Sequence, residues 1–140
     1  MYIRFVCASP HPTVDAELGM FTALEKIDFS RFRGSLQRAH EEAFWWFKRN
    51  GGGGLAYPRL TGKLRTQKVR KSLFWFNADA SFWGYRKGSV VQRARDLAAV
   101  MTEAGCEIRE VTVKDPGEII WKDTIQVLAH YSSGRIPRAF

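Results

Sequence analysis

The sequence predicts an α+β fold, a two-layer sandwich in which helices cover one face of a mixed sheet of four to five strands. Residues 72–77, SLFWFN, form an apolar and aromatic run without Gly or Pro, which is typical of a strand buried on both faces. Apolar residues over 80–101 recur at steps of three and four and indicate a helix, and alternation after Gly105 indicates half-buried strands. We expect the order β-α-α-β-α-β-β in one domain over residues 1–131, with a loose tail over 132–140.

The first fifty residues are expected to supply one strand and two helices. Tyr2–Ala8 alternates around apolar side chains and predicts a strand, which the SPHP sequence at 9–12 ends because Pro cannot continue a ladder. Apolar residues at helical spacing predict a helix over 13–27 and a stronger one over 35–50. The four glycines at 51–54 then end the second helix.

The helix after the central strand has a clear end and two alternative starts. Gly105 follows its last periodic turn and predicts an end near Ala104. The helix begins either near Asp79, which places two glycines in its interior, or at Ser89, which is a good N-cap residue. We favour the longer helix.

The last third of the chain is expected to be mainly strands. Cys106–Val113 alternates apolar and polar residues and predicts a strand with one face in water. The DPG sequence at 115–117 predicts a turn. Glu118–Trp121 and Thr124–Tyr131 then predict two strands, or one bent strand, at an antiparallel edge.

No metal site, cofactor or membrane span is expected. Cys7 and Cys106 fall in predicted strands without the short spacing of a zinc or redox motif, so we expect two buried, reduced thiols. His11, His40 and His130 also lack metal-ligand spacing. The start of the chain does not fit a signal peptide, and no apolar run approaches the roughly 20 residues of a membrane span. We therefore expect a cytoplasmic protein.

Positive charge is concentrated in the middle of the chain. The net charge is +8, and residues 51–100 hold ten Lys or Arg against two Asp or Glu, whereas the rest of the chain is nearly balanced. This distribution favours a polyanionic partner, with nucleic acid of no particular sequence as the leading candidate. The predicted basic contact residues are Arg59, Lys63, Arg65, Lys68, Arg70, Lys71, Arg86, Lys87 and Arg93. The rings expected to stack on unpaired bases are Tyr57, Trp83 and Tyr85.

A more local anion site is expected only if the central helix begins at Ser89. The free N–H groups of the first helical turn would then converge with Arg86 and Lys87 on one phosphate. A continuous helix from Asp79 removes this site.

Two alternatives to polyanion binding stay open. Trp45 lies opposite part of the apolar stripe of its helix, and an exposed Trp is typical of an interface anchor in an adaptor or a homodimer. In a small enzyme, Asp123 and Gln126 would share a site with Trp75, the Asp polarising a water that the Gln orients. An Asp in a tight bend more often caps its own backbone, so we expect a binding protein rather than an enzyme.

The chain resembles a family of small bacterial proteins in four pieces between about residues 15 and 130. The pieces are Gly19–Phe21, the Trp46–Asn50 helix end with Pro58 beyond it, Trp75-Phe76, and Asp115–Val127. The last piece is the most specific, because its Pro-Gly turn, aromatic residue, Asp, Gln and Val follow the order of the family. The chain departs from the family at Asn77, where the family has a lysine, and at Lys122, where it has an acid. The resemblance implies a shared fold and a bacterial origin. It does not indicate an activity.

Overall fold

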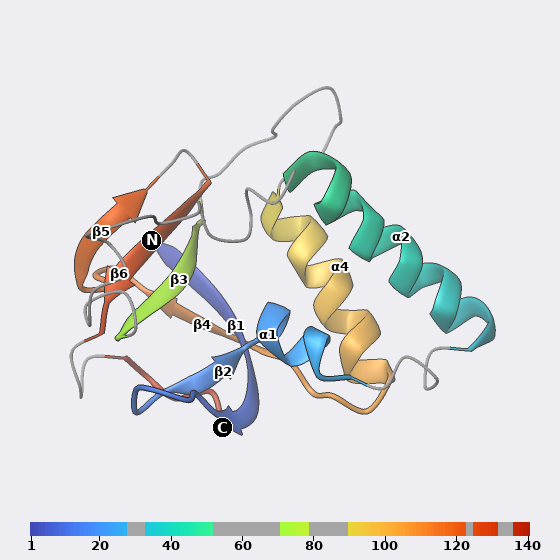
Figure 1. Cartoon of the computed structure of the whole chain (residues 1–140), viewed down its shortest axis with the longest axis horizontal. Helices are drawn as coiled ribbons and strands as arrows, with labels where there is room; N and C mark the ends of the chain where they lie inside the picture. Colours follow the sequence, from blue (N-terminus) through green and yellow to red (C-terminus); the bar gives the residue numbers. More distant parts are fainter. Residues whose placement is uncertain (28–32, 52–70, 79–89, 123–124, 132–135) are drawn as a thin grey trace.

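The computed structural model describes residues 1–27, 33–51, 71–78, 90–122, 125–131 and 136–140. These ranges form strands and helices in one α+β arrangement, which confirms the predicted fold class. In chain order the elements are β1 (Tyr2–Pro10), β2 (Glu17–Gly19), α1 (Met20–Glu25), α2 (Gly34–Gly51), β3 (Ser72–Asn77), α4 (Val90–Glu103), β4 (Arg109–Val113), β5 (Glu118–Lys122) and β6 (Gln126–His130), as Figure 1 shows.

The described strands form one six-stranded sheet. Its order is β2-β1-β3-β6-β5, and β4 also pairs with β1. The pairs between these strands are antiparallel. The mixed sheet of four to five strands is therefore wrong in its strand number and in its pairing. The helix between two strands suggested a parallel crossover, but α4 connects β3 to β4, and each of these strands pairs antiparallel with β1 between them.

Strand β1 changes partners along one of its edges. It pairs with β3 only through Tyr2 and Ile3, and with β2 from Val6 onward. Because β4 pairs with β1 from Tyr2 to Val6, which includes positions paired with β3 and with β2, these two strands must share the opposite edge. Arg4 and Phe5 lie between the two partners and pair with neither. The sheet is therefore split at these two residues.

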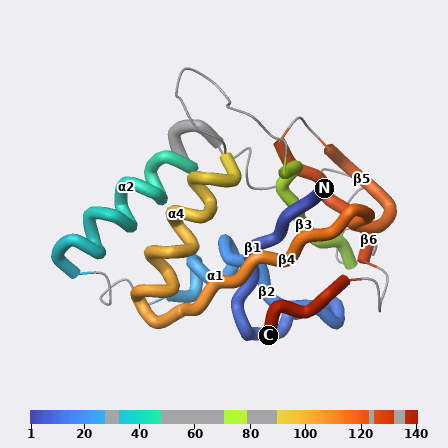
Figure 2. Tube along the Cα trace, turned by 180° about the vertical axis from the view of Figure 1, so that it is seen from behind, coloured from blue at the N-terminus to red at the C-terminus, as the bar shows by residue number. Residues whose placement is uncertain are grey.

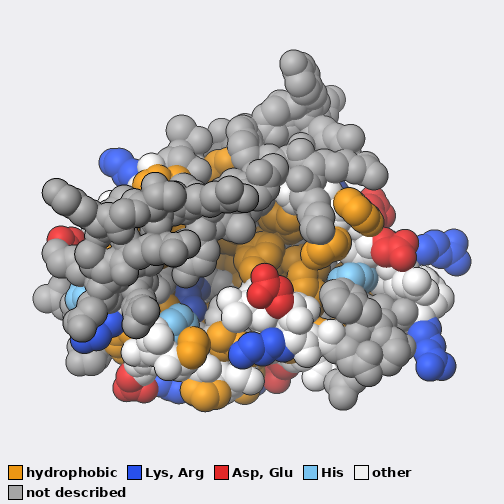
Figure 3. Space-filling model, viewed as in Figure 1, with side chains coloured by type: hydrophobic (Ala, Val, Ile, Leu, Met, Phe, Trp, Pro, Cys, Tyr) orange, Lys and Arg blue, Asp and Glu red, His pale blue; other side chains and the backbone are white. Residues whose placement is uncertain are grey.

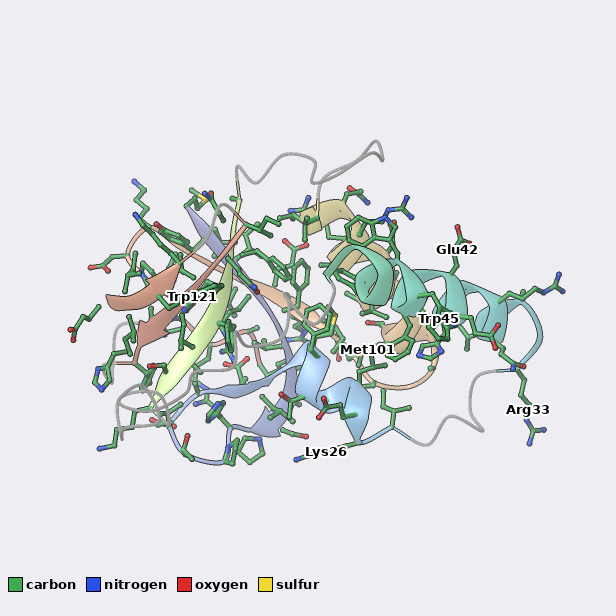
Figure 4. The ribbon with its side chains drawn as sticks, turned by 45° about the horizontal axis from the view of Figure 1, so that its top comes forward. Lys26, Arg33, Glu42, Trp45, Met101 and Trp121 are labelled. Carbon is green, nitrogen blue, oxygen red and sulfur yellow. The ribbon has the colours of Figure 1, made fainter. Side chains whose placement is uncertain are left out.

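Helices cover one face of the sheet, as the sequence predicts. In both Figure 1 and Figure 2, α2 and α4 lie side by side to one side of the strands. Leu97 and Met101 of α4 are fully buried in a core that also contains Ile3, Phe5 and Phe76 of the sheet. Figure 4 shows Met101 between α4 and α1.

The opposite face of the sheet is covered by residues near the end of the chain. Trp75 faces this side and belongs to a second core, against which Ile136 and Ala139 pack. The N–H of Ala139 donates to the Glu17 carboxylate at 2.9 Å, and Arg109 donates to the Ala139 carbonyl at 2.6 Å. These contacts hold the last residues on the sheet, where the sequence predicted a loose tail.

The end of α4 agrees with its prediction, and it also explains why β4 begins late. Gly105 has a left-handed backbone with φ of +99°, and the Cys106 N–H donates to the Met101 carbonyl at 2.9 Å, as in a Schellman motif. The Cys106 amide is therefore used by the helix end, and β4 begins at Arg109 rather than at Cys106. Cys7 is buried as predicted, whereas Cys106 is half-buried outside a strand, and neither forms a disulfide. The two alternative starts of this helix, at 79 and 89, lie outside the described residues.

The predicted helix over 13–27 is wrong in its first half. The His11 N–H donates to the Ala16 carbonyl at 2.8 Å, which closes a turn between β1 and β2, and only Met20–Glu25 is helical. Pairing of 17–19 with β1 outweighs the helical spacing of the apolar residues. Strand β1 also continues to Pro10, beyond the part of β1 that pairs with β4. Pro10 has no N–H, but at this position no hydrogen bond to β4 is lost.

Candidate binding site

A cavity opens at the split of the sheet. Its volume is about 190 Å³, and β1 contributes Ile3, Arg4 and Phe5, the residues at and beside the split. Residues 72–76 of β3 line another side, and 19–22 at the start of α1 line a third. Figure 3 shows hydrophobic atoms at the bottom of a hollow near the middle of this face. The cavity therefore exists because β1 leaves β3 before it meets β2.

The walls of the cavity are rich in aromatic rings. Phe76 contacts Phe5 and Phe21 edge to face, with centroids 6.0 and 6.1 Å apart. Phe74 and Trp75 of β3 also line the cavity. The polar side chains among the described lining residues are Arg4, His11, Thr22, Glu25, Ser72 and Gln126.

Arg4 contributes a buried positive charge to the lining of the cavity. The side chain lies close to Gly19, and Nη2 donates to the backbone carbonyl of Glu17 at 3.0 Å. Arg4 is 5% exposed, and burial lowers its pKa to about 10, although Glu17 opposes this shift. It therefore stays protonated at neutral pH. A guanidinium has five N–H donors, and within the described residues Arg4 makes this one hydrogen bond.

His11 lies near Arg4 and adds a second donor. Burial lowers the pKa of His11, and the positive charge of Arg4 lowers it further. The Thr13 N–H donates to Nδ1 at 3.2 Å, so the neutral ring must carry its proton on Nε2. At neutral pH the ring is therefore an uncharged N–H donor.

The carboxylate of Glu17 is held by residues near the end of the chain. It accepts the Ala139 N–H at 2.9 Å, and Arg138 Nε lies 3.6 Å from it. Arg138 also pairs with the exposed Asp15 at 3.2 Å. Arg4 binds the Glu17 carbonyl instead, so its charge has no direct carboxylate partner among the described residues.

Two of the residues proposed for an enzyme site lie at this cavity. Gln126 and Trp75 both line it, and the side chain of Gln126 is buried. The Nε1 atom of Trp75 is also buried and has no acceptor among the described residues. Asp123 lies outside the described residues, so its place in such a site stays a prediction.

Most of the predicted polyanion contacts lie outside the described residues. They are Arg59, Lys63, Arg65, Lys68, Arg70, Arg86 and Lys87, together with the rings Tyr57, Trp83 and Tyr85. Of the basic residues that are described, Lys71 is exposed next to β3. Arg93 is half-buried, with its guanidinium carbon 5.2 Å from the centroid of the Trp46 ring. Arg95 pairs with Glu110 at 2.6 Å, so part of the excess charge is neutralised.

The sequence did not predict that Arg4, His11 and Glu17 would meet. The alternation of Tyr2–Ala8 places Arg4 on the side of the strand opposite Ile3, Phe5 and Cys7. A signal was present, because Val6 puts an apolar side chain on the same face as Arg4. An apolar residue beside Arg4 on the same face indicates that this face is covered. A buried Arg on a covered face needs a hydrogen-bond or charge partner.

Trp45 is exposed as predicted, at 48% of its surface, and lies on α2 with Glu42 in Figure 4. Whether it contacts another protein or a second copy stays a prediction. In the described part of the chain, the helices are too short or too polar to span a bilayer. The same residues include no group of three or more His, Cys, Asp or Glu side chains placed to hold a metal ion.

Comparisons of the chain with models of protein families, with curated proteins and with solved structures find no match. The resemblance to small bacterial proteins therefore stays a prediction.

Proposed function

We propose that the protein binds a small organic molecule with a single ring in the cavity at the split of the sheet. The volume of about 190 Å³ between aromatic walls carries this proposal. An apolar cavity of about 150 Å³ accepts benzene, so the space suits one ring with a small substituent. Small-molecule sites are typically concave and mostly apolar, with a few placed polar groups.

The cavity lies beside a backbone edge of β1 that pairs with neither β3 nor β2. It is open to the surface, so the apolar side chains that line it are exposed to solvent there. A ligand ring that binds in the cavity removes this apolar surface from water and gains dispersion contacts with the rings that line it.

Replacing Gly19 by Leu is expected to block the cavity without straining the backbone. Gly19 has an extended backbone (φ −69°, ψ 149°), and the nearest atom to an added Cβ is Arg4 Nη2 at 3.7 Å, an ordinary contact. A Leu side chain there takes up space beside Arg4. Titration with toluene, followed by two-dimensional NMR, should give millimolar or tighter binding with shifts at residues 3–5 and 72–76. We expect Gly19→Leu to weaken this binding at least tenfold, on the order of 1.4 kcal/mol.

Gly19→Ala is the matched control, since one methyl group leaves most of the volume free. It should bind toluene within about threefold of the unmodified protein, roughly 0.6 kcal/mol. Equal binding by the Leu variant, or shifts that spread away from the cavity, would contradict the proposal.

A second candidate function is binding of a polyanion by the middle of the chain. The observation that favours it is the excess of eight positive charges over residues 51–100, ten against two, in a chain of net charge +8. Lys and Arg contacts to phosphates supply most nonspecific affinity for nucleic acid. This proposal is independent of the cavity.

Binding to a labelled single-stranded oligonucleotide tests the polyanion proposal. We expect affinity to fall steeply between about 50 and 200 mM salt, because each phosphate contact releases a counterion. Lys68→Gln with Arg70→Gln should reduce the slope of log K against log salt by about 1.4, and Arg33→Gln with Arg38→Gln, just before and within α2, should change it less. No affinity at low salt, or affinity independent of salt, would rule the proposal out.

A further inference from the structure

We infer that the ligand of the cavity carries an anionic group, a carboxylate or a phosphate, which binds beside Arg4 and His11. This inference rests on the proposed binding function and names the chemical class of the ligand. It places the ring of the ligand against the phenylalanines and its charge beside Arg4.

The Arg4 guanidinium is a buried positive charge. It is removed from water, and its one hydrogen bond within the described residues is to the Glu17 carbonyl. A buried charge without a partner is costly. Carboxylates and phosphates accept two parallel N–H bonds from a guanidinium, which is the strongest pairing available to it. An anionic ligand would therefore supply the partner that the described part of the chain does not.

His11 adds a hydrogen-bond donor near Arg4. His11 lines the cavity with Arg4, and its neutral ring carries a proton on Nε2. The guanidinium carbon of Arg4 lies 5.8 Å from the centroid of the Trp75 ring. A ligand with several acceptor oxygens matches this group of donors, whereas an amine or another cation would meet the charge of Arg4.

The nearby acids do not remove this preference. The carboxylate of Glu17 is taken up by the Ala139 N–H and by Arg138. Glu25 lines the cavity but is exposed, so water and salt screen its charge more than they screen that of the buried Arg4. The net charge of the groups around Arg4 in the cavity is therefore positive.

Titration of the unmodified protein with benzoate, phenyl phosphate, benzamide and toluene tests the inference directly. We expect at least one of the two anions to bind about tenfold more tightly than benzamide, which has the shape of benzoate without its charge. Preference for benzoate would identify a carboxylate ligand, and preference for phenyl phosphate a phosphate ligand. Equal binding of benzoate, phenyl phosphate and benzamide would overturn the inference and leave the proposed function standing. Failure of all four compounds to bind would overturn both.

Variants of Arg4 add a second measurement. Arg4→Gln should weaken benzoate binding about tenfold more than it weakens toluene binding, because the charge-assisted bonds are made only to benzoate. Arg4→Lys keeps the charge but loses the fork of donors, and should lie between the two. Arg38→Gln removes the same charge from the exposed surface of α2 and should have little effect. If Arg4→Gln folds but loses toluene and benzoate binding by the same factor, the inference is contradicted. If Arg4→Gln does not fold, the ratio of benzoate to benzamide affinity of the unmodified protein tests the inference instead.

Discussion

Replacing Gly117 by Ala is expected to lower the free energy of unfolding by about 3 kcal/mol. Gly117 has φ of +106°, and an added Cβ would lie 2.3 Å from the backbone carbonyl oxygen of His130. The Gly117 N–H also donates to Asp115 Oδ1 at 2.9 Å, which fixes the turn into β5. The clash is with backbone, so the turn or the β5–β6 pair must move. Urea unfolding of the variant measures the loss.

Gly34→Ala is the matched control for this prediction. Gly34 also has a positive φ, +59°, but an added Cβ meets nothing within 4 Å. Its cost is therefore the left-handed backbone alone, about 1 kcal/mol. Equal losses in the two variants would show that the contact with His130 does not limit the turn.

Replacing Leu97 by Ala is expected to lower the free energy of unfolding by about 3 kcal/mol, within the range of about 2 to 5 for buried leucines. Leu97 is fully buried on the side of α4 that faces the sheet, in the core that contains Phe5 and Phe76. Removing it takes apolar contacts from the packing of helix on sheet and leaves a cavity. Urea unfolding followed by circular dichroism should show a lower midpoint with a similar slope.

Leu36→Ala provides the matched control, since it is the same substitution in a helix at a half-buried position of α2. It should cost about 1 kcal/mol, because part of the side chain is already in water. A loss at Leu36 as large as that at Leu97 would contradict the packing of α4 described above.

Elements with a strong local signal were predicted well. The aromatic run of β3 and the apolar stripe of α2 gave bounds within about one residue, and the end of α4 followed from Gly105. Predictions failed where pairing at long range decided the structure. Residues 17–19 have helical spacing but join β1 as a strand, and β4 begins late because the Cys106 amide caps α4. The antiparallel sheet likewise depends on β1 separating β3 from β4, which local patterns do not report.

The candidate site was predicted only in part. Gln126 and Trp75 were proposed to share a site, and both line the cavity. The sequence did not predict that Arg4 and His11 also line it. Arg4 and His11 meet because β1 leaves β3 after two residues, and this partner change has no signature in a single strand. The predicted basic contacts rest on charge alone, and most of them lie outside the described residues.

A crystal structure of the protein grown with benzoate tests the central claim most directly. The claim is that the split of the sheet at Arg4 and Phe5 forms a site for an anionic ring compound. We predict density for a ring in the cavity, against the side chains of Phe5 and Phe76 that line it, with the carboxylate within hydrogen-bond distance of the Arg4 guanidinium. A β1–β3 ladder that continues through Arg4 and Phe5 and closes the cavity would contradict the claim.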